Sequence, residues 1–121
     1  MAKRHDLRQL YIDGWYEKDV DKLVSSIAPG FIFDDPAEPL PVTADMFTGY
    51  IERWYRRTEE AGAANEWVLR DEVRQDRDGV LIDWEQWELV GTDLSGMAVI
   101  RTSDDGVLLE RITYFDRHLR T

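Results

Sequence analysis

The sequence predicts an α+β fold in which three N-terminal helices cover a strongly curved antiparallel sheet. Two observations support this prediction. Helical spacing of apolar residues dominates the first half of the chain, and alternating strand patterns separated by glycine-containing turns fill the second half. The length of 121 residues is close to the commonest size of one domain, so we expect a single domain spanning residues 1–121.

The first two helices are predicted from apolar spacing and from a capping residue. Apolar residues recur at helical spacing between about residue 3 and residue 18. Asp19 is a suitable N-cap for a second, short helix from Val20 to about Ile27, and we expect the Pro29–Gly30 pair to end it. The residues on the first apolar stripe are Leu7, Leu10, Tyr11, Gly14 and Trp15.

A short strand and a long helix are expected next. The segment FIFDDP has a strand pattern that places Phe31, Phe33 and Asp35 on one face. A proline-containing loop follows, and Thr43 is expected to cap a helix that Gly62 ends.

Four further strands complete the predicted sheet. Asp78–Gly79 and Asp105–Gly106 are turn pairs suited to hairpins, and a glycine-containing loop separates the middle two strands. A strongly twisted sheet of this kind curls, and the hollow beneath it is a natural place for a pocket. The expected strands span residues 66–75, 80–90, 96–103 and 107–116.

Composition and charge exclude several classes of function. The formal net charge is −10, and its acidic residues are spread along the chain. Such a surface repels phosphate backbones and anionic lipids, so we expect neither nucleic acid nor a membrane as partner. The chain has no cysteine, no bilayer-spanning apolar run and no signal-peptide pattern, which favours a cytoplasmic location. His5 and His118 are far apart in the sequence and no nucleotide fingerprint occurs, so we expect no metal and no cofactor.

The order of elements, together with FIFDDP, PLPVTAD and the closing DGVLLERITYFD, resembles the nuclear transport factor 2-like superfamily. Within it the chain is similar to SnoaL-like and ketosteroid-isomerase-like members over nearly its whole length. This resemblance implies a cystatin-like fold, a cone with a hydrophobic pocket inside. Because the fold hosts isomerases, cyclases, dehydratases, hydrolases and binding modules, it does not fix the activity.

Residues 11–36 align without gaps with ketosteroid isomerases. By this resemblance, Tyr11 matches the tyrosine of their oxyanion hole and Asp35 matches their proton-shuttling aspartate. Trp15 matches a smaller apolar pocket residue, which indicates a smaller ligand. The second oxyanion acid of that family falls on Ala98, and this departure argues against steroid isomerisation.

Asp35 and Tyr11 are therefore the candidate catalytic residues. If its strand face points inward, the Asp35 carboxylate lies among aromatic rings, where desolvation would raise its pKa and make it a general base. Tyr11 could then donate a hydrogen bond to a developing enolate oxygen. Alternatively, Asp35 ends the strand and caps a turn, Asp34 is the inward acid, or Tyr11 is a core residue.

The aromatic residues give two further expectations. On the strand at 80–90 the resemblance implies that odd positions point inward, yet the even positions, which include Trp84, are at least as apolar. Two apolar faces indicate a homodimer formed through the outer face of the sheet. The candidate ligand-binding residues are Trp15, Phe33, Trp54, Trp67, Trp87, Arg111 and Phe115.

Arg111 is open to several interpretations. It could bind a carboxylate or carbonyl oxygen of a ligand. It could also pair with Asp35 or Asp83, or form a surface salt bridge with Glu110 or with a partner strand.

The leading hypothesis is a cofactor-independent enzyme of the isomerase, cyclase or dehydratase type. It would use an aspartate as acid/base on a small, apolar or carbonyl-bearing molecule. The alternatives are a dimeric module that binds an apolar metabolite without chemistry, and a protein-interaction scaffold.

Overall fold

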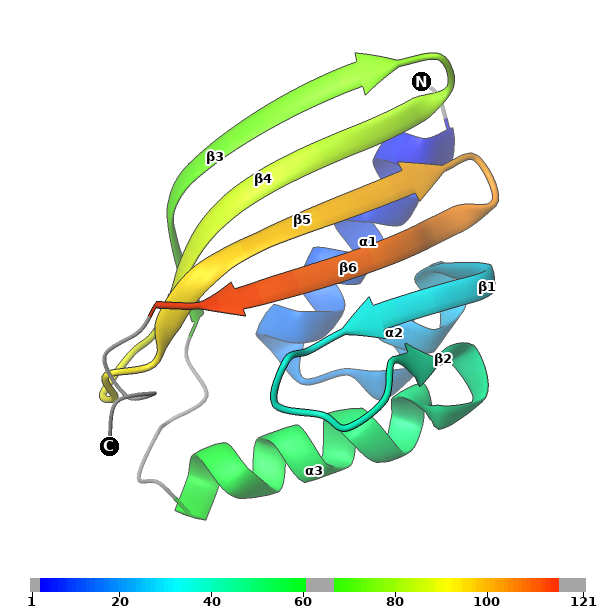
Figure 1. Ribbon diagram of the computed structural model, residues 1–121. Coiled ribbons are helices and arrows are strands. Elements are labelled where there is room, and N and C mark those ends of the chain that lie inside the picture. The colour runs from blue at the N-terminus through cyan, green and yellow to red at the C-terminus, as the bar shows by residue number, and fades with distance from the viewer. Residues whose placement is uncertain (1–2, 61–66, 116–121) are drawn as a thin grey trace.

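A computed structural model describes residues 3–60 and 67–115, with the side chain of Trp67 left out (Figure 1). Within these residues the chain forms three α-helices, one 3-10 helix and six strands. In chain order they are α1 (Lys3–Glu17), α2 (Val20–Ser26), β1 (Ile27–Asp34), β2 (Val42–Thr43), η1 (Ala44–Met46), α3 (Phe47–Glu60), β3 (Trp67–Arg77), β4 (Val80–Leu89), β5 (Ser95–Ser103) and β6 (Gly106–Tyr114).

The strands form one sheet in the order β2-β1-β6-β5-β4-β3. Strands β3 to β6 are an antiparallel meander, as predicted, whereas β1 pairs with β6 in parallel and with β2 antiparallel. The sheet is strongly curved, and the three helices lie on its concave side (Figure 1). This confirms the α+β class and the predicted layering. None of the described helices is long and apolar enough to cross a membrane.

Asp19 caps α2 as predicted, since its Oδ1 accepts the N–H of Lys22 at 3.2 Å. The helix ends at Ser26, within one residue of the predicted end at about Ile27, but the Pro29–Gly30 pair does not end it, because that pair lies inside β1. Gly30 has a φ of +82°, a left-handed conformation that suits glycine, and it lies where the pairing of β1 with β6 is irregular.

The start of the third helix also differs from the prediction. Thr43 precedes the 3-10 helix η1 and makes no side-chain cap; its hydroxyl donates to Oδ1 of Asp45 at 2.9 Å instead. Gly62, which was expected to end α3, lies outside the described residues.

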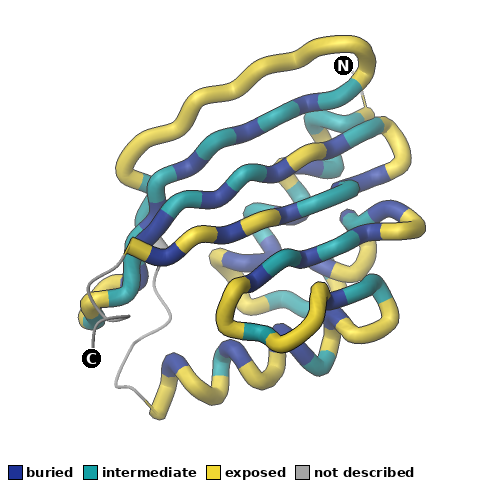
Figure 2. The backbone as a smooth tube through the Cα atoms, in the orientation of Figure 1, coloured by how far each residue is buried: buried dark blue, intermediate teal, exposed yellow. Residues whose placement is uncertain are grey.

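Strand β4 settles which face of the sheet points inward. Its odd positions are buried and its even positions are half-buried, so Trp87 points into the cone and Trp84 points outward. The same alternation runs through β5 and most of β6, and the edge strand β3 is largely exposed (Figure 2). The inward set on β4 is Leu81, Asp83, Glu85, Trp87 and Leu89.

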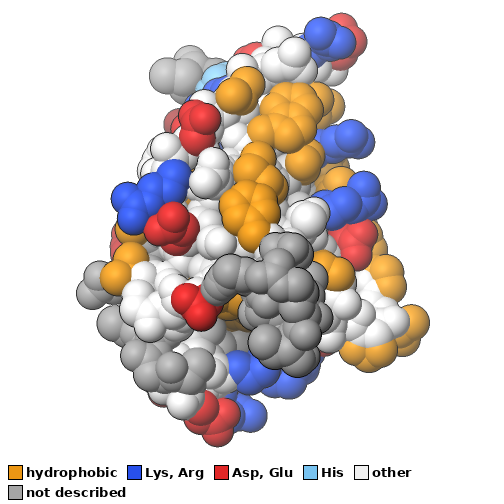
Figure 3. Space-filling model, turned by 60° about the vertical axis from the view of Figure 1, so that its left-hand side comes forward, with side chains coloured by type: hydrophobic (Ala, Val, Ile, Leu, Met, Phe, Trp, Pro, Cys, Tyr) orange, Lys and Arg blue, Asp and Glu red, His pale blue; other side chains and the backbone are white. Residues whose placement is uncertain are grey.

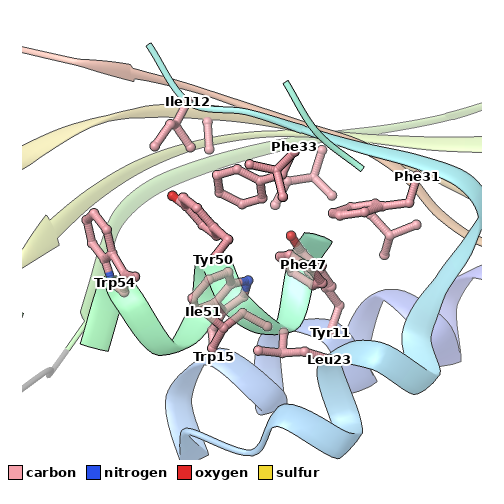
Figure 4. Packing of buried hydrophobic residues seen from close by; sticks show 14 of the residues in the cluster. Tyr11, Trp15, Leu23, Phe31, Phe33, Phe47, Tyr50, Ile51, Trp54 and Ile112 are labelled. Carbon is pink, nitrogen blue, oxygen red and sulfur yellow. The ribbon is translucent and has the colours of Figure 1, made fainter. Parts of the chain in front are cut away.

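The core lies between the concave side of the sheet and the three helices, and it is rich in aromatic rings (Figure 4). Phe33 packs against Tyr50 with ring centroids 4.8 Å apart, and Phe31 packs against Phe47 at 4.7 Å. Gly14 lets α1 approach α2, because a Cβ at this position would lie 2.7 Å from Cγ of Leu23. These contacts hold α1 and α3 over the hollow of the sheet.

Candidate functional site

A cavity of about 50 Å³ lies inside the cone, between the sheet and helices α1 and α3. A volume of this size holds a few water molecules or the small end of a larger ligand. Four predicted ligand-binding residues contribute to its lining, and the aromatic part of that lining consists of Trp15, Tyr16, Phe33, Tyr50, Trp54 and Trp87. That these residues bind a ligand stays a prediction.

Two buried carboxyl groups, those of Glu110 and Glu85, also line the cavity. Glu110 lies on the inward side of β6, and its Oε1 accepts a hydrogen bond from the hydroxyl of Tyr11 on α1. Burial raises the pKa of Glu110 to about 7, although the Tyr11 hydrogen bond and the more distant Arg8 act in the opposite direction. With this pKa, both the protonated and the ionised form of Glu110 are populated near neutral pH.

Glu85 differs from Glu110 because a buried cation accompanies it. Arg8, which is 1% exposed, contacts Glu85 and also donates from Nε to Asp83 at 3.0 Å. Arg74 donates to the other oxygen of Asp83 at 2.7 Å. Burial raises the pKa of Glu85, and the ion pair with Arg8 opposes that rise.

Asp35 is buried, at 2% exposed, but it does not line the interior cavity. Its carboxylate accepts the hydroxyl of Tyr50 at 2.7 Å and the hydroxyl of Tyr114 at 3.0 and 3.1 Å. Its Oδ1 also accepts the N–H of Ala37 at 2.9 Å, which is the turn contact that one interpretation of the sequence predicted. Tyr50 thus separates the Asp35 carboxylate from the interior cavity.

Tyr11 is fully buried and lies behind Glu110, outside the lining of the cavity. Burial raises the pKa of its hydroxyl well above the usual value, so Tyr11 stays protonated and donates to Glu110. The structure therefore places the two predicted catalytic residues one layer behind the cavity, each hydrogen-bonded to another side chain.

The placement of Arg111 and Phe115 among the pocket residues is corrected by the structure. Arg111 points to the outer face of β6, where its Nε donates to Asp34 on the neighbouring strand at 2.9 Å and its side chain is 60% exposed. Phe115 is 40% exposed on the same side. Alternation along β6 explains both positions, because Glu110 and the buried Tyr114 occupy the inward side. The side chain of Trp67 lies outside the described part of the structure.

Sequence reasoning overlooked Glu110 as a functional residue and gave no role to Glu85. The signal for both was a charged residue on a strand face that also carries large apolar side chains, which indicates a buried carboxyl group. Glu110 lies on the same strand face as Ile112 and Tyr114, and Glu85 lies on the same face as Trp87. Each glutamate therefore occupies a face on which these neighbours are apolar.

A second cavity, of about 440 Å³, adjoins the C-terminal end of α3 and the loop between β4 and β5. Trp54 lines both cavities, which makes them neighbours across its side chain. The guanidinium of Arg57 lies 5.8 Å from the centroid of the Trp54 ring. Leu89, Leu94 and Tyr114 contribute apolar surface to this outer cavity. No group of three or more histidine, cysteine, aspartate or glutamate residues suited to a metal ion occurs in the described ranges.

Comparison with solved structures supports the fold. A cystatin-like fold protein from Burkholderia xenovorans superposes with a TM-score of 0.69 and 12% identity, covering 94% of this chain and 90% of that chain. A candidate SnoaL-like polyketide cyclase from Shewanella putrefaciens gives 0.68 and 16%, covering 94% and 80%. A candidate ketosteroid isomerase from Parabacteroides distasonis gives 0.68 and 10%, covering 93% and 87%.

These likenesses confirm the cystatin-like fold that the sequence resemblance predicted. At identities below 20% they establish the fold alone. No family model and no curated protein sequence matches this chain.

Proposed function

We propose that this protein binds a small, largely apolar molecule in its interior cavity and moves a proton on it without a cofactor, with Glu110 as the acid/base. The observation that carries this proposal is the Glu110 carboxyl, which is buried and lines an aromatic cavity, where desolvation raises its pKa to about 7. A general acid/base works best when its pKa lies near the working pH. The candidate cyclase and candidate isomerase among the similar structures agree with chemistry of this kind.

In this proposal, three other groups support Glu110 and the cavity. Tyr11 is a positioning residue, since its hydroxyl holds one carboxylate oxygen of Glu110. Asp35 holds the hydroxyls of Tyr50 and Tyr114 and so fixes one wall of the cavity. A ligand longer than a few atoms extends past Trp54 into the outer cavity.

Solvent deuterium exchange tests the proposal without knowledge of the substrate. Small cyclic ketones and cyclic imines are incubated with the protein in D₂O, and loss of the carbon-bound hydrogens next to C=O or C=N is followed by NMR. We expect the protein to accelerate exchange in at least one compound. Glu110→Gln should reduce that acceleration by about 10²-fold or more, because the proton acceptor is lost.

Asp34→Asn is the matched control, because it removes an acid from the outer face and leaves the cavity intact. It should exchange at the wild-type rate. If compounds bind but exchange no faster than in buffer, the protein is a binding module without chemistry. Exchange that Glu110→Gln leaves unchanged would exclude Glu110 as the acid/base.

We also propose that two copies associate through the outer face of the sheet. There Val73 pairs in register with Trp84, which in turn pairs with Val99, so an apolar row crosses three strands. Val73 is 58% exposed and Trp84 is half-buried in the single chain. Figure 3 shows a strip of hydrophobic side chains bordered by arginine or lysine side chains on the face that it presents. Exposed apolar rows of this kind are typical of subunit interfaces.

A further inference from the structure

The interior cavity offers acidic groups and aromatic rings to a ligand, and no lysine, arginine or histidine belongs to its described lining. Its ionisable carboxyl groups are those of Glu85 and Glu110, and Tyr16 lies at its rim, 44% exposed. Aromatic ring faces attract cations. The net charge of −10 adds a negative field around the molecule. This environment favours a positively charged group over a negative one.

Of the two carboxyl groups in the described lining of the cavity, that of Glu110 has no basic side chain as an ion-pair partner. Arg8 lies between Asp83 and Glu85, and Arg74 makes a second pair with Asp83. Among the described residues no basic group lies within ion-pair distance of Glu110, whose hydrogen-bond partner is the Tyr11 hydroxyl. Glu110 is nevertheless more than nine-tenths buried and lines the cavity. A cation in the cavity would supply the missing partner.

Three tyrosine hydroxyls close to the cavity already donate to carboxylates. Tyr11 donates to Glu110, and both Tyr50 and Tyr114 donate to Asp35. A hydroxyl has one hydrogen to donate, so these bonds leave none of the three hydroxyls for a ligand oxygen. The fourth tyrosine at the cavity is Tyr16, which lies at the exposed rim. An enolate-forming carbonyl ligand needs such donors. The buried Ala98, where the sequence resemblance places a second donor acid, supplies none.

We infer that the small end of the ligand carries a positively charged nitrogen, a protonated amine or imine, and that Glu110 is its counter-ion. This inference rests on the proposed function, whose cavity and acid it uses. A protonated imine also suits proton transfer. The Glu110 carboxylate takes the hydrogen next to C=N⁺, the C–H electron pair forms a C=C bond, and the C=N pair moves to nitrogen. The product is a neutral enamine, so no oxyanion needs stabilising.

Binding of a cation at Glu110 depends on pH. Because the pKa of Glu110 is about 7, the ionised fraction rises about tenfold between pH 6 and pH 8. Alkylammonium ions stay protonated across this range, as lysine does. The charged or titratable groups that face Glu110 come from four parts of the fold: Tyr11 and Arg8 from α1, Glu85 from β4, Tyr50 from α3, and Asp35 after β1.

The test compares three probes of similar size: isobutylamine, isobutanol and isobutyrate. Tryptophan fluorescence or calorimetry gives their affinities for the full chain at pH 6, 7 and 8. We expect the amine to bind at least tenfold more tightly than the alcohol at pH 8, with an affinity that rises about tenfold from pH 6. The carboxylate should bind most weakly. Glu110→Gln should remove the preference and its pH dependence but keep binding of isobutanol, whereas Asp34→Asn should change neither.

Two outcomes would overturn the inference and leave the proposed cavity standing. In one, the alcohol binds as tightly as the amine at pH 8. In the other, ligand affinity falls as the pH rises, which indicates a protonated Glu110 that donates to a neutral ligand. Failure of all three probes to bind to the folded wild-type protein would count against the proposed function as well. The pH series on the wild type gives these answers even if Glu110→Gln does not fold.

Discussion

Glu110 is the residue whose titration should be visible in the stability of the protein. The folded state holds the Glu110 proton up to about pH 7, whereas the unfolded chain releases it near the ordinary value of 4.5. Between these values the folded state binds more protons, so the free energy of unfolding falls as the pH rises, by about 3 kcal/mol from this group. Above pH 7 the contribution is constant.

Glu110→Gln should cancel this dependence, because glutamine does not titrate. Urea unfolding at pH 4.5, 6 and 7.5 should show the variant gaining about 3 kcal/mol relative to wild type between the lowest and highest pH. A difference between the two proteins that stays constant with pH would show that the Glu110 carboxyl is not desolvated in the folded state.

Asp35 has a structural role of which the sequence predicted only the turn contact and not the two tyrosine hydrogen bonds. Because it accepts two tyrosine hydroxyls and a backbone N–H while buried, Asp35→Asn should lower the free energy of unfolding by about 2–4 kcal/mol. Chemical denaturation measures this loss, and Asp34→Asn on the outer face should cost less than about 1 kcal/mol. A stable Asp35→Asn protein that has lost deuterium exchange would instead restore Asp35 as the acid/base.

At the scale of elements, Arg8 ties helix α1 to strand β4. Its guanidinium compensates the buried Asp83 and Glu85, and removing it leaves charge in a dry interior. Arg8→Met keeps much of the side-chain volume and should lower the free energy of unfolding by about 3–5 kcal/mol at pH 8. The loss should shrink at pH 5, because burial raises the pKa of Glu85 to about 8 and this carboxyl group is then protonated.

The matched control for Arg8→Met is Arg70→Met. Arg70 pairs with Glu88 at 2.9 Å on an exposed part of the sheet, so its loss should cost less than about 1 kcal/mol. Urea unfolding of both variants checks the contrast. Equal losses in the two variants would mean that the buried cluster does not anchor α1.

At the scale of the whole molecule, the proposed interface predicts that the protein has the mass of a dimer in solution. Wild-type protein should elute in light-scattering chromatography at twice the chain mass of 14.2 kDa. Trp84→Glu should shift it to a single chain mass, because a charge would be buried opposite its own copy. Val24→Glu, at a 43% exposed position on α2, should remain a dimer. A wild-type monomer would exclude the interface.

Local patterns in the sequence determined most of the layering. The helical spacing of α1, the Asp19 cap and the Gly-containing turns are properties of neighbouring residues, so they predicted these elements in the correct order, although not β2 or η1. On α1 the buried face includes Arg8, whereas the predicted stripe residues Leu7 and Leu10 are half-buried. Two local predictions were wrong. The Pro29–Gly30 pair was expected to end a helix but lies in a strand that pairs with β6, and Thr43 was expected to cap α3 but precedes a 3-10 helix.

Only the tertiary structure decided the site. Both faces of β4 are apolar enough to be buried, so the inward face follows from the helices that cover the concave side. Hydrogen bonds between residues far apart in the chain then assign the roles: Tyr11 to Glu110, and Tyr114 to Asp35. Sequence proximity carries no information about such pairs. The sequence therefore determined the fold and an aromatic hollow, whereas long-range packing decided which carboxyl group faces it.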